Sequence, residues 1–91
     1  MELLSDTEIR RRLEQSSWQR DGEEIVLERK LDDFAGAMAF ANRVAEAAES
    51  VNHHPDILIH GWNKVRLRLS THSAHGLTEA DFALARTLED L

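Results

Sequence analysis

Three histidines are the residues of this chain best suited to chemistry: the adjacent His53 and His54, which are followed by Pro55, and His72. Neutral imidazole accepts a proton and imidazolium donates one near neutral pH, so histidines held together can act as general base and general acid. A repelling or buried pair also pushes one imidazole toward its neutral, basic form. The cluster therefore predicts proton transfer, in which one histidine is the acid and another is the base.

The same histidines have two other interpretations. Polar side chains at the ends of helices and strands also cap backbone carbonyls or face water, and three separated histidines define no motif by themselves. A zinc site is the third possibility, but adjacent histidines direct their rings apart, and the chain has no cysteine to complete a ligand set. Zinc is therefore disfavoured, whereas the acid–base and the capping interpretations of the histidines both stay open on spacing alone.

Four other side chains are candidates to orient an imidazole or a ligand. Glu49 lies one helical turn before His53, where it could hold that imidazole, or it is a solvated helix-surface acid. Asp56 and Asp81 could hold an imidazole or a polar ring substituent; otherwise Asp56 is a loop acid and Asp81 is a first-turn acid that favours the helix dipole. Trp18 could stack on a heteroaromatic ligand or simply cover the edge of the core.

The apolar periodicity and the turn residues predict the elements that must position these side chains. A long helix that starts after Asp32 and Asp33 and ends at Pro55 would place His53 and His54 at its exit, and a strand would end near His72. The full order is a helix from about Ser5 to Gln15, a hairpin of residues 17–20 and 24–31, the long helix, a hairpin of residues 57–59 and 65–71, and a helix after Thr78. This order predicts an α+β fold, with a four-stranded, mainly antiparallel sheet and three helices on one face.

Composition limits the kind of protein this can be. A chain of 91 residues with 42% hydrophobic residues has enough apolar side chains for one modest core, so we expect a single domain over residues 1–91. The net charge of −6 argues against nucleic acid and anionic membranes as partners. The amino terminus carries acids and arginines where a signal peptide needs an apolar stretch, and no apolar run is long enough to span a membrane. We therefore expect a cytoplasmic protein whose partner is a small molecule or another protein.

A longer pattern makes the histidines more informative. It consists of Glu49, His53-His54-Pro55, Trp62, His72 and Asp81, with Trp18, Asn63-Lys64-Val65, Ser70-Thr71-His72 and Gly76-Leu77-Thr78-Glu79 around it. This pattern resembles the signature of the pterin-4a-carbinolamine dehydratases, and the resemblance covers essentially the whole chain. The segment after Pro55, Asp56-Ile57-Leu58-Ile59, is more similar to bacterial members than to animal ones.

The resemblance implies dehydration of a 4a-hydroxytetrahydropterin to the quinonoid dihydropterin, which recycles the cofactor of aromatic amino acid hydroxylases. It implies a homodimer or homotetramer that needs no cofactor. His53, His54 and His72 would be the catalytic and pterin-contacting set, with Glu49 and Asp81 as orienting acids and Trp18 near the pocket. Our hypothesis is that His54 donates the proton to the departing hydroxyl, while His53 and His72 share the base and binding roles.

The alternative is a non-catalytic binding module, because relatives of this fold serve as transcriptional coactivators or assembly chaperones. The chaperone-like relatives tend to have lost the histidine set, whereas this chain retains all three. The histidines therefore favour the enzyme.

Overall fold

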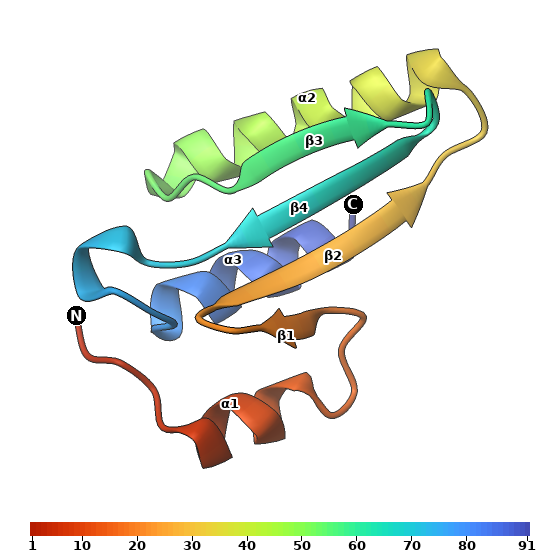
Figure 1. Cartoon of the computed structure of the whole chain (residues 1–91). Coiled ribbons are helices and arrows are strands. Elements are labelled where there is room, and N and C mark those ends of the chain that lie inside the picture. The colour runs from red at the N-terminus through yellow and green to blue at the C-terminus, as the bar shows by residue number, and fades with distance from the viewer.

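The chain folds into three α-helices and four strands in the order predicted from the sequence (Figure 1). The computed structural model describes residues 1–91. Its elements are α1 (Asp6–Leu13), β1 (Gln19–Asp21), β2 (Glu24–Lys30), α2 (Phe34–Val51), β3 (Asp56–His60), β4 (Lys64–Leu69), the short 3-10 helix η1 (His72–Ala74) and α3 (Glu79–Glu89). The α+β class is therefore confirmed, and η1 is the one helical element that the apolar pattern did not predict.

The four strands form one antiparallel sheet in the order β1-β2-β4-β3. Side chains alternate across it: Val65, Leu67 and Leu69 of β4 are fully buried, whereas Arg66 and Arg68 lie on the opposite face. Helices α2 and α3 lie behind the sheet in Figure 1, on the same side as each other. One face of the sheet is therefore covered and the other carries charged side chains.

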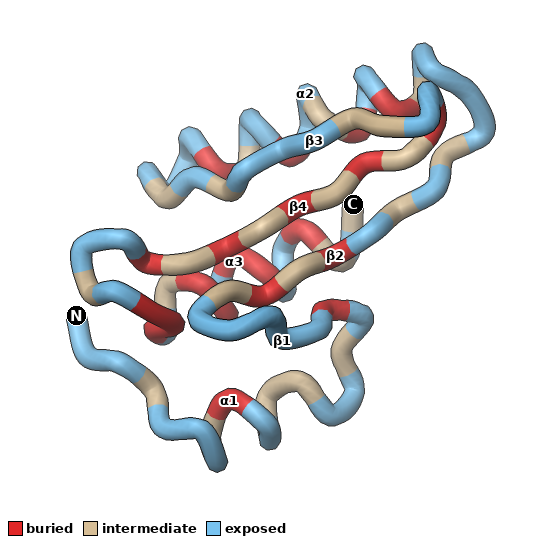
Figure 2. The backbone as a smooth tube through the Cα atoms, in the orientation of Figure 1, coloured by how far each residue is buried: buried red, intermediate tan, exposed pale blue.

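The core lies between the covered face and the helices. It contains 16 buried apolar side chains, among them Phe40, Val44 and Ala48, which recur at helical spacing on α2. Figure 2 shows buried residues along β4, along α3 and at intervals on α2. No helix combines the length and the apolar composition needed to cross a membrane.

Helix α2 ends at Val51 and is capped by Asn52, so the prediction that it ends at Pro55 is wrong. Asn52 adopts a left-handed conformation with φ of 51°, and its backbone N–H donates to the carbonyls of Ala48 and Glu49. Asparagine tolerates this conformation better than most residues and closes helices in the manner of glycine. The local stop comes before the proline can act, and His53 and His54 therefore lie in the irregular segment between α2 and β3.

Strand β4 ends at Leu69, two residues before the predicted end at Thr71. Thr71 instead forms an isolated bridge with Gly76, in which its backbone N–H donates to the Gly76 carbonyl at 2.9 Å. The chain then turns through η1, and His72 lies in this turn rather than at a strand end.

The open face of the sheet carries an ion-pair network that predicts a pH-dependent stability. Arg66 Nε donates to Glu28 Oε2 at 2.9 Å, and His60 also pairs with Glu28. Partial burial acts to raise the pKa of Glu28, but the hydrogen bonds from Arg66 and His60 outweigh it and hold this pKa below its usual value. A lowered pKa in the folded state means that ionised Glu28 stabilises the fold above its unfolded-state pKa, and that this stabilisation disappears as pH falls through the lowered value.

Glu28→Gln is therefore expected to lower the free energy of unfolding at neutral pH by less than about 1 kcal/mol, because the group is largely exposed to solvent. The difference should shrink toward zero at the lowest pH at which both proteins stay folded. Urea unfolding of wild type and Glu28→Gln, at neutral pH and at that lowest pH, measures the difference in free energy. An equal difference at both pH values would show that the charge of Glu28 contributes nothing to stability.

Candidate active site

The end of α2, the start of β3, the η1 turn and the first turn of α3 meet at one end of the sheet (Figure 1). His53 and His54 follow α2, His72 belongs to η1, and Asp81 lies in the first turn of α3. Residues that are far apart in the sequence are brought together here because β4 runs antiparallel to β3 and returns to the end at which β3 starts.

The centre of this site is a pair formed by His53 and Asp81. Nε2 of His53 lies 2.7 Å from Oδ1 of Asp81, and the Asp81 side chain is completely buried. The other carboxylate oxygen, Oδ2, accepts from the Thr71 hydroxyl at 2.7 Å and from the Thr78 backbone N–H at 2.9 Å. A buried carboxylate is tolerated when its oxygens accept several hydrogen bonds, and three donors surround this one.

Both interpretations of Asp81 from the sequence describe what it does. It closes the capping box of α3, in which its carboxylate accepts from the backbone N–H of the N-cap residue Thr78. It also holds an imidazole, and its first-turn position at the helix N-terminus favours the negative charge that this requires.

The Asp81 contact determines which nitrogen of His53 can react. An ionised carboxylate only accepts hydrogen bonds, so Nε2 of His53 must carry the proton that is donated to Oδ1. In neutral His53 the lone pair then lies on Nδ1. The ring keeps 18% of its side-chain surface exposed, so Asp81 orients the imidazole without enclosing it. This arrangement suits a general base, because Asp81 also stabilises the imidazolium formed after proton uptake.

His54 has a different environment from its neighbour. Its Nε2 pairs with Glu49 Oε2, and the two side chains are 54% and 73% exposed. Glu49 was expected to pair with His53 by helical spacing, but the left-handed Asn52 takes the chain out of the helix, and His53 turns toward Asp81 instead. An ionised Glu49 can accept the Nε2 proton of His54, and the exposed ring stays accessible to water or to a ligand.

His72 is exposed on η1 and follows Thr71, whose hydroxyl is bonded to Asp81. The η1 turn is therefore tied to the same carboxylate that holds His53. Thr71 and Thr78 are the site residues that sequence reasoning missed as part of the cluster. The cap pattern at Thr78 was a signal in the sequence, but it indicated only the start of a helix and gave no connection to a histidine.

Two candidates make no hydrogen bond to the three histidines. The Trp18 indole is buried in the core, and its Nε1–H donates to the Ala85 carbonyl at 3.1 Å. Asp56 is the first residue of β3 and lies opposite Arg68 on the open face of the sheet. The geometry gives neither side chain a hydrogen bond to the three histidines.

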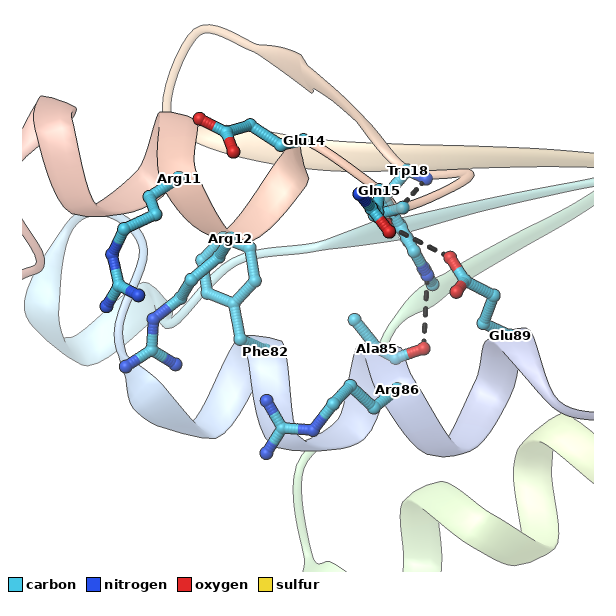
Figure 3. Close-up of a pocket in the computed structure, with 10 residues that line it drawn as sticks. Arg11, Arg12, Glu14, Gln15, Trp18, Phe82, Ala85, Arg86 and Glu89 are labelled. Atoms are coloured by element: carbon cyan, nitrogen blue, oxygen red, sulfur yellow. Dashed lines mark hydrogen bonds between the residues drawn. The ribbon is translucent and has the colours of Figure 1, made fainter.

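Two cavities line opposite faces of α3. The one beside His53 has a volume of about 220 Å³ and is lined by small or apolar side chains, together with His53 itself: Ala47, Ser50, Val51, Ala80, Ala83, Leu84 and Thr87. The other, of about 480 Å³, lies between α1 and α3 and includes Trp18 and Phe82 (Figure 3). The two share no residue.

The larger cavity has guanidinium groups on its rim that already have acidic partners. Arg11 and Arg12 both hydrogen-bond to Glu8, and these bonds lower the pKa of the Glu8 carboxyl. Arg12 also pairs with Glu79 at 2.5 Å. Of these two cavities, the one beside His53 is the one lined by a histidine of the candidate site. Neither at this site nor elsewhere does the chain bring together three or more His, Asp or Glu side chains arranged to hold a metal ion.

Comparison with known proteins identifies the family of this chain. The family model described as pterin 4 alpha carbinolamine dehydratase matches residues 2–91. A protein of Thermomicrobium roseum is 48% identical over 92 residues, covering 100% of this chain and 98% of that protein. A protein of a Nostoc species is 45% identical over 91 residues, covering 99% and 97%. Both are named, provisionally, as pterin-4-alpha-carbinolamine dehydratases.

Solved structures show the same fold. A transcriptional coactivator/pterin dehydratase of Brucella melitensis superposes with a TM-score of 0.88 at 33% identity, over 96% of this chain and 95% of that one. A pterin dehydratase-like protein identified as a RuBisCO assembly factor of the alpha-carboxysome superposes with a TM-score of 0.69 at 24% identity, over 84% and 89%. The second likeness shows the fold alone. With the family model and the close relatives spanning the whole sequence, this chain belongs to the pterin-4-alpha-carbinolamine dehydratase family.

Proposed function

We propose that this protein is a cytoplasmic enzyme that dehydrates 4a-hydroxytetrahydropterin to the quinonoid dihydropterin, with His53, His54 and His72 as its catalytic and pterin-contacting set. The observation that carries the proposal is the pairing of His53 with a fully buried carboxylate, Asp81, beside an exposed second imidazole. A solvated or merely capping histidine would not need a buried carboxylate that is itself held by two further donors.

The reaction breaks the bond between C4a and its hydroxyl oxygen, and water leaves. His54, as imidazolium next to Glu49, delivers a proton to the departing hydroxyl. Nδ1 of His53 removes a proton from a ring nitrogen, whose electron pair forms the new double bond to carbon. Nothing is oxidised or reduced, and solvent returns the two histidines to their starting protonation states. Each positioned proton transfer contributes ~10²–10⁴-fold to the rate.

Stopped-flow absorbance of 4a-hydroxytetrahydropterin tests this function, because the substrate also loses water spontaneously and the uncatalysed rate is an internal reference. We expect the protein to accelerate the loss well above that rate. A folded protein that leaves the spontaneous rate unchanged would favour the non-catalytic binding module. Two observations support that alternative: the names of the two structural neighbours, and the exposed apolar side chains of α2, such as Phe34, which is 55% exposed.

We also propose that two copies of the chain pair along β3, as the unit of a homodimer or homotetramer. β3 is an edge strand whose Ile57 and Leu58 are 39% and 49% exposed. Antiparallel pairing centred on Leu58 would place Leu58 against Leu58 of the partner subunit and Asp56 against His60 of the partner subunit. An apolar pair at the centre and an acid opposite an imidazole at both ends make this strand self-complementary.

Leu58→Lys is expected to shift the protein toward monomer, because pairing would then bring two lysines face to face and remove the central apolar pair. Sedimentation velocity over a range of protein concentrations measures the shift. Met38→Lys, at a 42% exposed apolar position of α2, is the matched control and should leave the strand-paired dimer intact. If Leu58→Lys stays associated while Met38→Lys dissociates, the subunits meet through the helix and not through β3.

A further inference from the structure

We propose that Thr71 is a positioning residue for the histidine site: its hydroxyl, donated to Asp81, sets how the carboxylate holds His53 as a base, while its backbone holds the η1 turn that carries His72. The kinetic part of this proposal rests on the proposed dehydratase function. The part that concerns the protonation of His53 does not.

The direction of the hydrogen bonds around Thr71 follows from counting protons. Oγ1 of Thr71 lies 2.7 Å from Oδ2 of Asp81 and 2.7 Å from Oγ1 of Thr78, and both threonines are buried. The carboxylate has no proton to give, so the single hydroxyl proton of Thr71 goes to Asp81. Thr71 can then bond to Thr78 only as acceptor. The Thr78 hydroxyl also lies 3.0 Å from Met1 Sδ, but a thioether is the weaker acceptor for its proton. With that proton on the oxygen of Thr71, the chain runs from Thr78 through Thr71 to Asp81.

Thr71 is also the donor to Asp81 that a side-chain substitution can remove without touching the imidazole. Of the three donors to this carboxylate, one is His53 itself and one is the backbone N–H of Thr78. Losing the Thr71 hydroxyl leaves more of the carboxylate charge for His53, which stabilises the imidazolium relative to the neutral base. Serine keeps the hydroxyl, whereas valine replaces it with a methyl group of similar size.

The backbone of Thr71 fixes the neighbouring turn. Its N–H donates to the Gly76 carbonyl at 2.9 Å, and its carbonyl accepts from the Ala74 N–H at 3.0 Å. His72 comes next in the chain and is carried on this turn. One residue therefore couples the position of His72 to the carboxylate that orients His53, although the two histidines lie 19 positions apart in the sequence.

Few other charges act on His53. Asp81 of α3 is the one carboxylate within hydrogen-bonding distance of it, and Glu49 of α2 is paired with His54. The cavity beside His53 is lined by no other ionisable side chain. His54 on the same segment and His72 on η1 are the remaining titratable groups of the site. A change in the donors to Asp81 should therefore be visible in the titration of His53.

The experiment compares wild type with Thr71→Val, Thr71→Ser and a matched control, Thr87→Val. Thr87 also lines the cavity beside His53 but has no bond to Asp81, since its hydroxyl donates to the Ala83 carbonyl. NMR follows the protonation of each imidazole against pH, after circular dichroism has shown that the variants are folded. We expect the His53 titration midpoint to move to higher pH in Thr71→Val, and to stay at the wild-type position in Thr71→Ser and Thr87→Val.

The same variants give a kinetic readout. The acid limb of the pH–rate profile should move to higher pH in Thr71→Val, with a drop of about 10-fold in kcat/KM near neutral pH, by analogy with the lower end of what hydrogen-bond partners of metal-ligating imidazoles contribute. Thr71→Ser should restore both the wild-type acid limb and the wild-type kcat/KM. An unmoved His53 midpoint in folded Thr71→Val overturns the proposal, as does a Thr71→Ser that fails to restore it. A moved midpoint in a protein without dehydratase activity would support the positioning role and reject the proposed reaction.

Discussion

Replacing Asp81 with asparagine is expected to lower both the dehydration rate and the stability of the fold. The asparagine carbonyl can accept from the Thr71 hydroxyl and the Thr78 N–H, which turns the amide group toward Nε2 of His53. An amide donor there requires Nε2 to be the acceptor, so the ring proton moves to Nδ1 and the base is lost. We expect the rate to fall by ~10²–10⁴-fold, the range for losing one general base or its correct tautomer.

The stability loss from Asp81→Asn should be roughly 1–3 kcal/mol, the cost of leaving buried hydrogen-bonding groups poorly paired. Stopped-flow kinetics and urea unfolding measure the two effects separately. Asp90→Asn, at the exposed C-terminal end of α3, makes the same chemical change without a histidine partner and should alter neither. If Asp81→Asn kept the wild-type rate, orientation of His53 by a carboxylate would have no part in catalysis.

His54→Ala is expected to lower the dehydration rate by ~10²–10⁴-fold while leaving the free energy of unfolding nearly unchanged. The rate falls because hydroxide is a poor leaving group and the departing oxygen then has to take its proton from water. Stability is preserved because His54 is 54% exposed and its partner, Glu49, is 73% exposed. The comparison of stopped-flow rates with urea unfolding separates a chemical role from a structural one.

Glu49→Gln provides the graded comparison for His54. It keeps the shape of the side chain and removes the charge that favours imidazolium, so we expect a smaller fall in rate than in His54→Ala, concentrated toward higher pH. A His54→Ala protein with the full wild-type rate would transfer the role of acid to His72 or to water. A Glu49→Gln protein slower than His54→Ala would show that Glu49 contacts the substrate directly.

The parts of the fold that depend on local signals were predictable from the sequence. Ser5 caps α1 by accepting from the Glu8 N–H at 3.1 Å, and Thr78 caps α3, as their spacing indicates. The alternation from Val65 to Leu69 identified the central strand and its buried face. These features require only neighbours in the sequence and a period of two or 3.6 residues, so no tertiary information was needed.

The ends of α2 and β4 were misplaced because the deciding interactions are not part of any periodic pattern. A single left-handed residue, Asn52, closes α2 before Pro55. Alternation continues through Ser70 and Thr71, but Thr71 is drawn into the bridge with Gly76 and toward Asp81, so the strand stops early. Both endings depend on contacts with distant parts of the chain or on one residue's backbone conformation.

The candidate site likewise combines features that local sequence predicts with features that depend on tertiary contacts. Residue types and spacing identified the histidines and named Asp81 as an acid that could hold one of them, which the structure shows for His53. The partner of Glu49 could not be predicted, because it depends on how the chain leaves α2. The structure bears out the interpretation that Trp18 covers the core, but its hydrogen bond could not be predicted, since an indole N–H bonded to a carbonyl 67 positions away leaves no trace in local sequence.

The most direct test of the histidine mechanism is a set of single-turnover stopped-flow measurements on wild type and on His53→Ala, His54→Ala, His72→Ala and His60→Ala. His60 is the internal control, because it pairs with Glu28 on the open face of the sheet, at the far end of β3 from His53. We predict that His60→Ala keeps the wild-type rate and that the other three lose most of their acceleration over spontaneous dehydration. If those three variants, correctly folded, matched His60→Ala, the account of catalysis at this end of the sheet would be contradicted.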